Sequence, residues 1–285
     1  MKATSTDIPK IKSLWKEVFG DSEDYIHRFI THFGIDGCYV CQMNDEIIAM
    51  TFAIPTTLIN SINLKSISLK YLYACATHPN FRKQGIMEKL LATIYEESCS
   101  ENYAGIFLYA ANHSLQNYYK KLGFEDYFFR NHSFYYNHKE HKENAKSETV
   151  DFNSLHSLQN PLQFKNFNLI TPENYYQKRI KKLKNFSFIN WNKDFFKFMN
   201  ETGTQFFEYE NGIFSLRTND NMIIIDEWLD TDTQNQIANL FFEQYPDFET
   251  VQIRTLGKEI CCGQIKWRKP FEHKPKNGYF AFAME

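Results

Sequence analysis

The chain has 285 residues, of which 43% are hydrophobic and 23% are charged, a composition typical of a globular protein with room for about two domains. It carries 32 Lys and Arg residues against 34 Asp and Glu residues, so the formal net charge of -2 provides no overall field for nucleic acid or an acidic membrane. The N-terminal residues lack the apolar core of a signal peptide, and no apolar run approaches the ~20 residues that span a bilayer. We therefore expect a cytoplasmic protein with no nucleic-acid partner and no membrane partner.

The cysteine and histidine residues predict neither a disulfide framework nor a metal site. Cys38 and Cys41 have C-x-x-C spacing, but they fall in an alternating strand pattern whose odd spacing sends them to opposite faces. His138 and His141 lie in a polar stretch that is typical of a solvated linker. We expect the six cysteines to be reduced thiols and the protein to hold no metal.

The first half of the chain predicts a mixture of helices and strands. The expected elements are helices at residues 8–19 and 25–33, strands at 39–41, 47–54 and 67–76, a helix from 86 to 95, a strand at 105–110, a short helix around 115–122, and two closing strands within 124–136. Asn44 and Asp45 form a favourable hairpin turn between the first two strands, and Gly123 is suited to end the short helix.

A polar segment at residues 137–150, NHKEHKENAKSETV, divides the chain into two halves. We expect a first domain at residues 1–136, this linker, and a second domain at residues 151–285. Helical material at 172–200 precedes strands at 205–209, 213–216 and 222–225, a helix at 234–245 and a strand at 249–253. Three strands, a helix and a strand thus occur in the same order in both halves, which predicts a weak repeat of architecture.

The stretch ATHPNFRKQGIMEKLL, from Ala76 to Leu91, is a strand that turns abruptly into a helix. The first backbone N–H groups of such a helix have no partner within it and lie at the positive end of its dipole, so they suit an anion. Gly85 allows a bulky anion to approach the main chain, and Arg82 and Lys83 add positive charge. These features favour a pyrophosphate, although a basic helix start that simply faces solvent explains the residues equally well.

Two motifs in the correct order resemble those of the GNAT superfamily, the Gcn5-related N-acetyltransferases. Residues 82–87, RKQGIM, are similar to the R/Q-x-x-G-x-G/A motif, and residues 119–124, YKKLGF, are similar to the Y-x-K-x-G-F signature downstream. The resemblance covers about residues 1–136. It implies an α+β fold, the GNAT acyl-CoA N-acyltransferase fold, with a mixed, mostly antiparallel splayed sheet flanked by helices. The second half would then be a degenerate GNAT-like domain.

The resemblance also implies a site for acetyl-CoA as cosubstrate. The main chain of Cys75, Ala76 and Thr77 would pair with the pantetheine arm as an added strand. The pyrophosphate would be bound by the backbone of Arg82, Lys83, Gln84, Gly85, Ile86 and Met87. Met87 departs from the usual Gly or Ala, but its N–H can still donate. Asn112 is similar to an asparagine that contacts the cofactor in many members.

Tyr119 matches the tyrosine that protonates the leaving thiolate of CoA in the family, a role that the departing sulfur requires of a nearby donor. In the alternative interpretation Tyr119 only packs, because it shares a helical stripe with Leu115, Tyr118 and Leu122. Tyr118 could also take its place.

The general base stays open at the level of sequence. Tyr71 lies where some members have a glutamate, and Tyr71 or Tyr73 could orient a water relay. Some two-domain relatives use their terminal carboxylate, and the present sequence ends at Glu285 after an aromatic segment that is more simply interpreted as an ordinary edge strand.

The second half lacks the cofactor motif, because carboxylates at residues 226–232 follow its third strand where the first half has Arg and Lys. We expect it to shape the acceptor pocket or to be structural. The sequence therefore predicts an acetyl-CoA-dependent N-acetyltransferase that acts on a primary amine of a small molecule or peptide. The alternatives are a noncatalytic acyl-CoA-binding or regulatory module and a tandem-GNAT aminoacyltransferase. An aromatic sheet edge would suit a homodimer.

Overall fold

The computed structural model describes residues 1–61, 63, 65–137, 167–209, 212–230, 234–271, 274–282 and 284. The helices are α1 (Ile8–Phe19), α2 (Glu23–Phe33), α3 (Ile86–Ser100), α4 (His113–Lys121), α5 (Pro172–Lys182), α6 (Lys193–Glu201) and α7 (Gln234–Gln244). The strands are β1 (Cys38–Met43), β2 (Glu46–Ile59), β3 (Ser66–Thr77), β4 (Gly105–Leu108), β5 (Glu125–Tyr136), β6 (Asn168–Leu169), β7 (Phe188–Asn190), β8 (Gln205–Tyr209), β9 (Gly212–Asn219), β10 (Met222–Leu229), β11 (Thr250–Leu256) and β12 (Ile260–Trp267). The predicted linker after residue 137, its two histidines and Glu285 lie outside the described residues.

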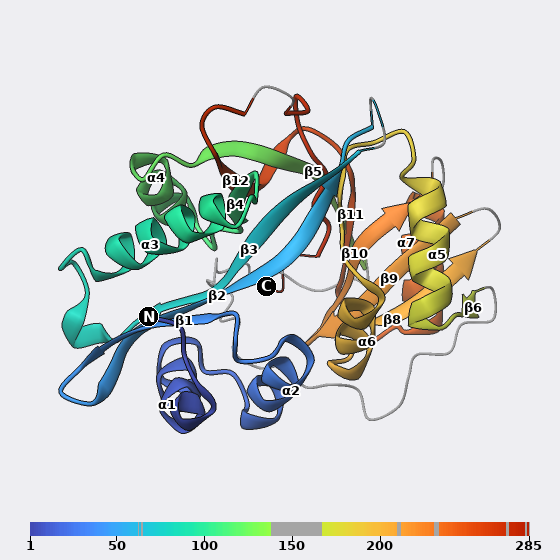
Figure 1. Ribbon diagram of the computed structural model, residues 1–285. Coiled ribbons are helices and arrows are strands. Elements are labelled where there is room, and N and C mark those ends of the chain that lie inside the picture. The colour runs from blue at the N-terminus through green and yellow to red at the C-terminus, as the bar shows by residue number, and fades with distance from the viewer. Residues whose placement is uncertain are drawn as a thin grey trace.

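One sheet of 12 strands runs through the molecule in the order β1-β2-β3-β4-β12-β5-β11-β10-β9-β8-β6, and β7 pairs with β2 beside this path (Figure 1). Most neighbours are antiparallel, whereas β3 with β4 and β10 with β11 are parallel. A parallel pair needs a crossover connection, which α3 and α7 provide. The predicted mixed, mostly antiparallel α+β fold is confirmed.

The two halves of the sheet repeat the same arrangement and exchange their last strands. Strands β1 to β4 and β8 to β11 each consist of antiparallel neighbours followed by a parallel pair. Between the halves, β12 pairs with β4 and β5 pairs with β11, while β5 and β12 pair with each other. Each half therefore continues the sheet of the other, and the predicted repeat of strand and helix order is confirmed.

The prediction of two closing strands within residues 124–136 is wrong, because these residues form the single strand β5. Residues 125–136 contain no glycine or proline at which a hairpin could turn. The neighbour that the first half needs comes instead from β12, more than a hundred residues later in the chain. By contrast, the hairpin at Asn44 and Asp45 is confirmed, since both residues have positive φ values, 50° and 66°, as a two-residue type I′ turn requires.

Helices cover both faces of the sheet. In the first half, α3 and α4 lie over one face with a buried cluster that includes Leu91, Ile94 and Tyr119. The opposite face packs against α1 and α2, and there a large central cluster also takes in residues of α5 and α6. In the second half, α7 lies over a third cluster around Phe241. Cys38 belongs to the central cluster and Cys41 to the α3 side, so the opposite faces predicted for them are confirmed.

The segment after β12 enters the centre of the molecule. Gly278 and Tyr279 form isolated bridges with Phe128 and Phe188. Phe280 and Phe282 are 0% and 1% exposed. The predicted edge strand is therefore wrong for the described part of this segment, because its aromatic side chains fill the core between the two halves rather than extend an edge.

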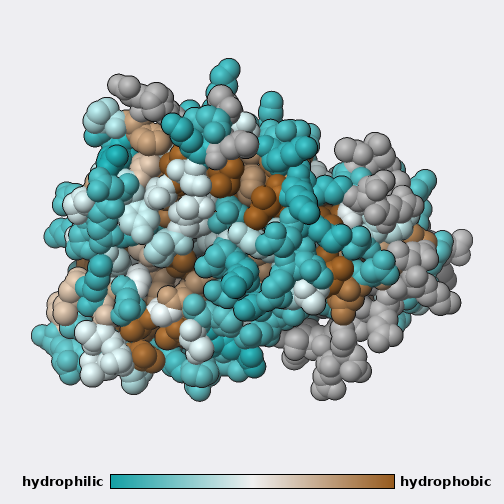
Figure 2. Space-filling view, turned by 45° about the vertical axis from the view of Figure 1, so that its right-hand side comes forward, coloured by the Kyte–Doolittle hydropathy of each residue, from teal (hydrophilic) through white to brown (hydrophobic). Residues whose placement is uncertain are grey.

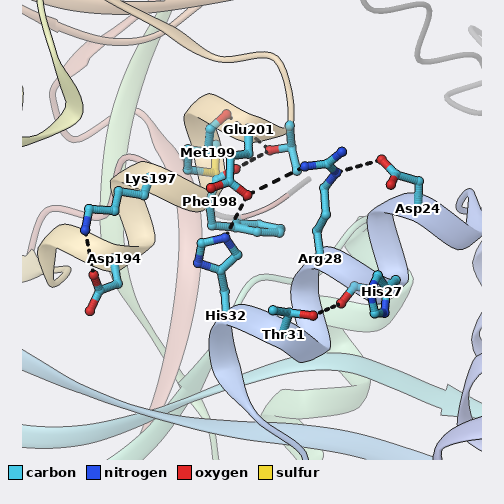
Figure 3. A network of polar contacts seen from close by, with 11 residues as sticks. Asp24, His27, Arg28, Thr31, His32, Asp194, Lys197, Phe198, Met199 and Glu201 are labelled. Atoms are coloured by element: carbon cyan, nitrogen blue, oxygen red, sulfur yellow. Dashed lines mark hydrogen bonds and ion pairs between the residues drawn. The ribbon is translucent and has the colours of Figure 1, made fainter.

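A polar network joins α2 of the first half to α6 of the second (Figure 3). A carboxylate oxygen of Glu201 lies 2.9 Å from His32 Nε2 and 3.7 Å from Arg28 Nη1, and Arg28 Nε donates to Asp24 at 2.7 Å. The ring of Phe198 packs against His32 beneath these groups, with 5.6 Å between ring centroids. These contacts hold α2 against the second half.

The face shown in Figure 2 is mainly hydrophilic, and hydrophobic residues appear on it as small separate patches. Within the described ranges, no helix combines the length and the apolar character that crossing a bilayer demands.

Candidate active site

At the predicted cofactor segment, β3 contains a bulge that changes which face of the sheet the following side chains occupy. Ala74 has a φ of 53°, a left-handed conformation that costs a non-glycine residue roughly 1–2 kcal/mol. The register with β2 shifts at this point, between Met50 and Phe52. As a result Tyr73 packs on the α1 and α2 side whereas Cys75, two residues later, packs on the α3 and α4 side.

The β3 edge that faces β4 is open from this bulge onward. β3 pairs with β4 only from Lys70 to Leu72, because β4 ends at Leu108. In the described part of the chain, no strand pairs with that edge at Cys75, Ala76 or Thr77. The three residues predicted to pair with a pantetheine arm thus have backbone groups available on one side.

The loop after β3 folds back on the end of that strand. Arg82 Nε donates to the carbonyl oxygen of Thr77 at 3.0 Å, and Gln84 Nε2 donates to that of Asn80 at 3.3 Å. Lys83 and Gly85 both have left-handed φ values, 63° and 73°. A Cβ built on Gly85 would meet no atom within 4 Å, so the space beside this residue is open. The loop therefore presents its main chain and its positive charges to solvent.

The N-terminus of α3 follows directly from this loop. Gly85 is its N-cap residue and no side chain caps it, so its first N–H groups point outward beside Arg82 and Lys83. The side chains of Ile86 and Met87 pack against the cluster beneath α3 and α4. Methionine in place of a small residue is thus accommodated by apolar packing, and its N–H stays at the helix start.

Asn112 has a structural role of its own in this structure. It is the N-cap of α4, where its Oδ1 accepts a hydrogen bond from the Leu115 N–H at 3.0 Å. Its side chain is exposed at the end of the β4 connection. The geometry places it on the same side of the sheet as α3, and a contact with a cofactor stays a prediction.

Tyr119 and Cys75 belong to the same cluster beneath α3 and α4. Cys75 Sγ lies 3.1 Å from Thr51 Oγ1, and the Cys75 thiol is close enough to the Tyr119 hydroxyl to act on its pKa. Thr51 Oγ1 in turn donates to the carbonyl oxygen of Tyr73 at 3.1 Å, across the bulge. Thr51 gives its one proton to that carbonyl oxygen, so the Cys75 thiol is the donor to Thr51 Oγ1.

The environment keeps both the Tyr119 hydroxyl and the Cys75 thiol protonated. Burial, and then the neighbouring Cys75 thiol, raise the pKa of Tyr119 well above its usual range. Burial also raises the pKa of the Cys75 thiol. Tyr119 is 6% exposed and is therefore a neutral phenol beside the Cys75 sulfur.

The residues considered as bases lie on the other face. Tyr71 is 1% exposed and its ring packs against those of Trp191 and Phe280, at 5.4 Å each. Tyr73 is half-buried, and its hydroxyl lies 2.9 Å from that of Tyr25. Glu285, the remaining candidate, is outside the described residues.

The acidic run of the second half is not placed as the sequence suggested. Strand β10 extends to Leu229, so Asp226 and Glu227 lie within it and not in a loop after it. Asp226 accepts hydrogen bonds from Arg217 and Arg254, both at 2.8 Å, and Glu227 accepts one from Arg179 at 2.8 Å. These two carboxylates are therefore buried and paired with arginines.

Sequence reasoning missed the residues that shape the site from other elements. Thr51 and Ala74 form the bulge, and no local pattern marks either, because the register of two strands decides where a bulge falls. Asp21 and Tyr25 lie on the α1 and α2 side of it. The break Gly20-Asp21-Ser22 between two helical patterns was the available signal for a loop there.

Over the residues that the structure covers, no three His, Cys, Asp or Glu side chains come together in a way that could hold a metal ion.

The comparisons with known proteins agree on the fold. Residues 1–126 match the family model described as an acetyltransferase (GNAT) domain. Among curated proteins, none matches the chain.

Solved structures resemble the chain over nearly its whole length. A GCN5-related N-acetyltransferase from Anabaena variabilis ATCC 29413 has a TM-score of 0.65 and 12% identity, over 93% of this chain and 69% of that one. One from Kribbella flavida has a TM-score of 0.62 and 12% identity, over 94% and 70%. A conserved protein of unknown function from Enterococcus faecalis V583, a probable N-acyltransferase, has a TM-score of 0.65 and 10% identity, over 93% and 69%. At these identities the likeness concerns the fold, and it extends across both halves.

Proposed function

We propose that the chain, whose residues 1–126 match the family model of an acetyltransferase (GNAT) domain, is an acetyl-CoA-dependent N-acetyltransferase whose acceptor is a primary amine. The observation that carries this proposal is the open edge of β3, which lies between an uncapped helix N-terminus and a protonated tyrosine. A thioester with a long polar arm and a pyrophosphate requires these three features in this order.

The cofactor fits the residues present. The free backbone groups of Cys75, Ala76 and Thr77 would hold the pantetheine arm, and the loop from Arg82 to Met87 would hold the pyrophosphate. The open space at Gly85 supports this assignment, because a phosphate must approach the main chain closely there. Acetyl-CoA supplies the activated acyl group, and the chain supplies its orientation.

Tyr119 is the proposed general acid. Its side chain lies in the same cluster as that of Cys75, next to the open edge of β3, where the cofactor sulfur would lie. A phenol with a raised pKa remains protonated at neutral pH, so it has a proton to give when the thiolate leaves. The transferred acyl group then stays on the acceptor nitrogen.

The two proposed units have different tasks. Residues 1–136 would carry the cofactor and the acid, with a linker at 137–150, and residues 151–285 would complete the wall on the acceptor side. The network between α2 and α6 and the central aromatic cluster support such a shared wall. A small molecule or a peptide amine could be the acceptor, and neither nucleic acid nor membrane is part of this proposal.

The test is a thiol-release assay with acetyl-CoA and a broad panel of primary amines. In Tyr119→Phe, we expect acetyl-CoA to bind with unchanged affinity by calorimetry while turnover falls on the order of 10²-fold. Tyr118→Phe is the matched control, since it removes the adjacent hydroxyl on the same helix, and it should retain its turnover. Equal turnover in Tyr119→Phe and wild type would move the acid role elsewhere.

The noncatalytic alternative has its own outcome in the same experiment. Acetyl-CoA binding without thiol release for any amine would favour a regulatory acyl-CoA-binding module. If neither CoA nor acetyl-CoA binds at millimolar concentration, both the acetyltransferase and the acyl-CoA-binding module are excluded.

A further inference from the structure

The helix that carries Tyr119 is short and is held on the sheet at two points. It has nine residues, which make about two and a half turns. Lys120 Nζ donates to Oδ2 of Asp126, near the start of β5, at 2.6 Å. The carbonyl oxygen of Gln116 accepts a hydrogen bond from Gln264 Nε2 of β12 at 3.2 Å. Tyr119 therefore lies between the two points along the helix.

One carboxylate joins the two points. Gln264 Nε2 also donates to Asp126 Oδ1 at 2.9 Å, while Oδ2 of the same carboxylate binds Lys120. Gln264 lies where the two halves exchange strands, opposite Leu108 of β4 and Asp126 of β5. Lys120, Asp126 and Gln264, which we call the α4 clamp, thus connect the helix to two neighbouring strands.

The α4 clamp acts on the turn of the helix that contains Tyr119. In an α-helix, the carbonyl of Gln116 also accepts from the N–H of Lys120, so the turn that this bond closes includes Tyr119. The carbonyl oxygen of Tyr119 accepts from the N–H groups of Leu122 and Phe124, at 2.9 and 3.1 Å. Its ring packs against that of Phe124, with 5.7 Å between centroids. Because the backbone is held on both sides of Tyr119, the position of α4 on the sheet sets the position of its hydroxyl.

Stability alone gives little reason for the α4 clamp. Gln264 is 1% exposed, and its Oε1 has no hydrogen-bond partner within the described ranges. A buried amide oxygen without a partner costs free energy that an apolar side chain of similar volume would avoid. The side chains of Lys120 and Asp126 are 42% and 31% exposed, and ion pairs at such positions contribute little to folding. A local arrangement that does not favour stability is typical of a functional site.

We propose that the α4 clamp consists of positioning residues for Tyr119, which hold its hydroxyl where the leaving sulfur of the cofactor needs a proton. The inference rests on the proposed function and adds three residues to it, one of them from the second half. They act through the backbone of α4 and contact neither cofactor nor acceptor. Because a misplacement of about 1 Å at a reacting centre is costly, a loosened clamp slows the step that Tyr119 assists and leaves binding intact.

The experiment is the thiol-release assay with acetyl-CoA and the best amine of the panel, together with calorimetry for acetyl-CoA affinity. Asp126→Asn keeps the shape of the side chain and removes its charge, whereas Gln264→Met keeps the volume and removes both hydrogen bonds. Lys120→Met loosens the clamp from a partly exposed position, and Lys120→Arg keeps the charge there. Glu125→Gln is the matched control, because it removes the neighbouring carboxylate of β5, which pairs with Lys274 at 2.9 Å.

We expect kcat to fall about tenfold in Asp126→Asn and Gln264→Met and about threefold in Lys120→Met, because a loosened helix holds the acid less well. The KM for the amine, the affinity for acetyl-CoA and the unfolding midpoint should stay close to those of wild type. Lys120→Arg should recover most of the rate, and Glu125→Gln should behave as wild type.

The same substitutions in the Tyr119→Phe background separate positioning from a merely structural role. Without the hydroxyl nothing is left to position, so the kcat of Tyr119→Phe should fall no further. If the clamp variants lower kcat by the same factor with and without the hydroxyl, or leave the wild-type kcat unchanged, the inference is wrong while the proposed function stands. A fall in the unfolding midpoint that tracks the loss of kcat would also overturn it. If wild type releases no thiol with any amine, both are wrong.

Discussion

A fully buried ion pair in the second half offers a quantitative test of how that half is stabilised. Arg179 of α5 and Glu227 of β10 are both 0% exposed, and Arg179 Nε lies 2.8 and 3.0 Å from the two carboxylate oxygens. Tyr175 donates its hydroxyl proton to the same carboxylate at 2.7 Å, and Arg179 Nη1 donates to the carbonyl oxygen of Ile189 at 3.1 Å. Removing one partner would leave a charge without compensation in an apolar surrounding.

The expected magnitude follows from that geometry. In Glu227→Leu, the guanidinium loses its carboxylate and the Tyr175 hydroxyl loses its acceptor, so we expect a loss of about 3–5 kcal/mol in the free energy of unfolding. Arg179→Met should cost a similar amount, since it leaves the carboxylate with Tyr175 alone. For a chain of this size such losses lower the unfolding midpoint by about 10 °C.

The combined variant separates this account from a general intolerance to substitution. With Arg179→Met, Glu227→Leu and Tyr175→Phe together, no charge or hydroxyl of the three remains buried, so stability should return to within about 2 kcal/mol of wild type. Thermal unfolding followed by circular dichroism measures all four proteins. A triple variant as unstable as Glu227→Leu would refute the reasoning, and so would a single variant that loses less than about 1 kcal/mol.

Two further predictions concern the first half. In Gly85→Ala, the left-handed φ of 73° should strain the start of α3 by roughly 1–2 kcal/mol and weaken acetyl-CoA binding measured by calorimetry, although the space beside it is open. Gly203→Ala, at a φ of 104° with equally open space, controls for backbone strain and should leave that affinity unchanged. In Cys75→Ala, the Tyr119 hydroxyl loses the neighbouring thiol, and kcat should fall about 3–10-fold with little change in KM. Cys75→Ser keeps a donor and acceptor there and should restore most of the rate; equal effects of the two substitutions would argue against a positioning role.

Local patterns were sufficient for the parts of the fold that depend on neighbouring residues. The apolar period of residues 8–19 predicts α1 with its full bounds, and Asn44-Asp45 predicts a turn whose φ values agree. The basic stretch before Gly85 likewise predicts the uncapped start of α3. In each case the interactions that decide the conformation lie within a few residues of one another.

Contacts between distant parts of the chain could not be predicted in this way. β5 is one strand rather than the expected hairpin, because its partner is β12. The periodicity within β5 or β12 does not show that the two strands pair with each other. The bulge at Ala74 depends on the register between β2 and β3. Asp226 and Glu227 were expected to follow the third strand of the second half. Their arginine partners come from β9, β11 and α5, which a linear pattern does not bring together.

Because the two halves exchange strands, the second half contacts the helices on the predicted cofactor side as well as the predicted acceptor side. Gln264 of β12 is 1% exposed, and its Nε2 donates to the carbonyl oxygen of Gln116 in α4 at 3.2 Å and to Asp126 of β5 at 2.9 Å. The hydroxyl of Tyr95 in α3 donates to the carbonyl oxygen of Trp267 in β12 at 3.0 Å. The helix that begins at the predicted pyrophosphate loop and the helix that carries Tyr119 are therefore both braced by a strand from the second half. Because a displacement of about 1 Å at a reacting centre is costly, the second half is expected to influence turnover even though the predicted cofactor motif lies wholly in the first.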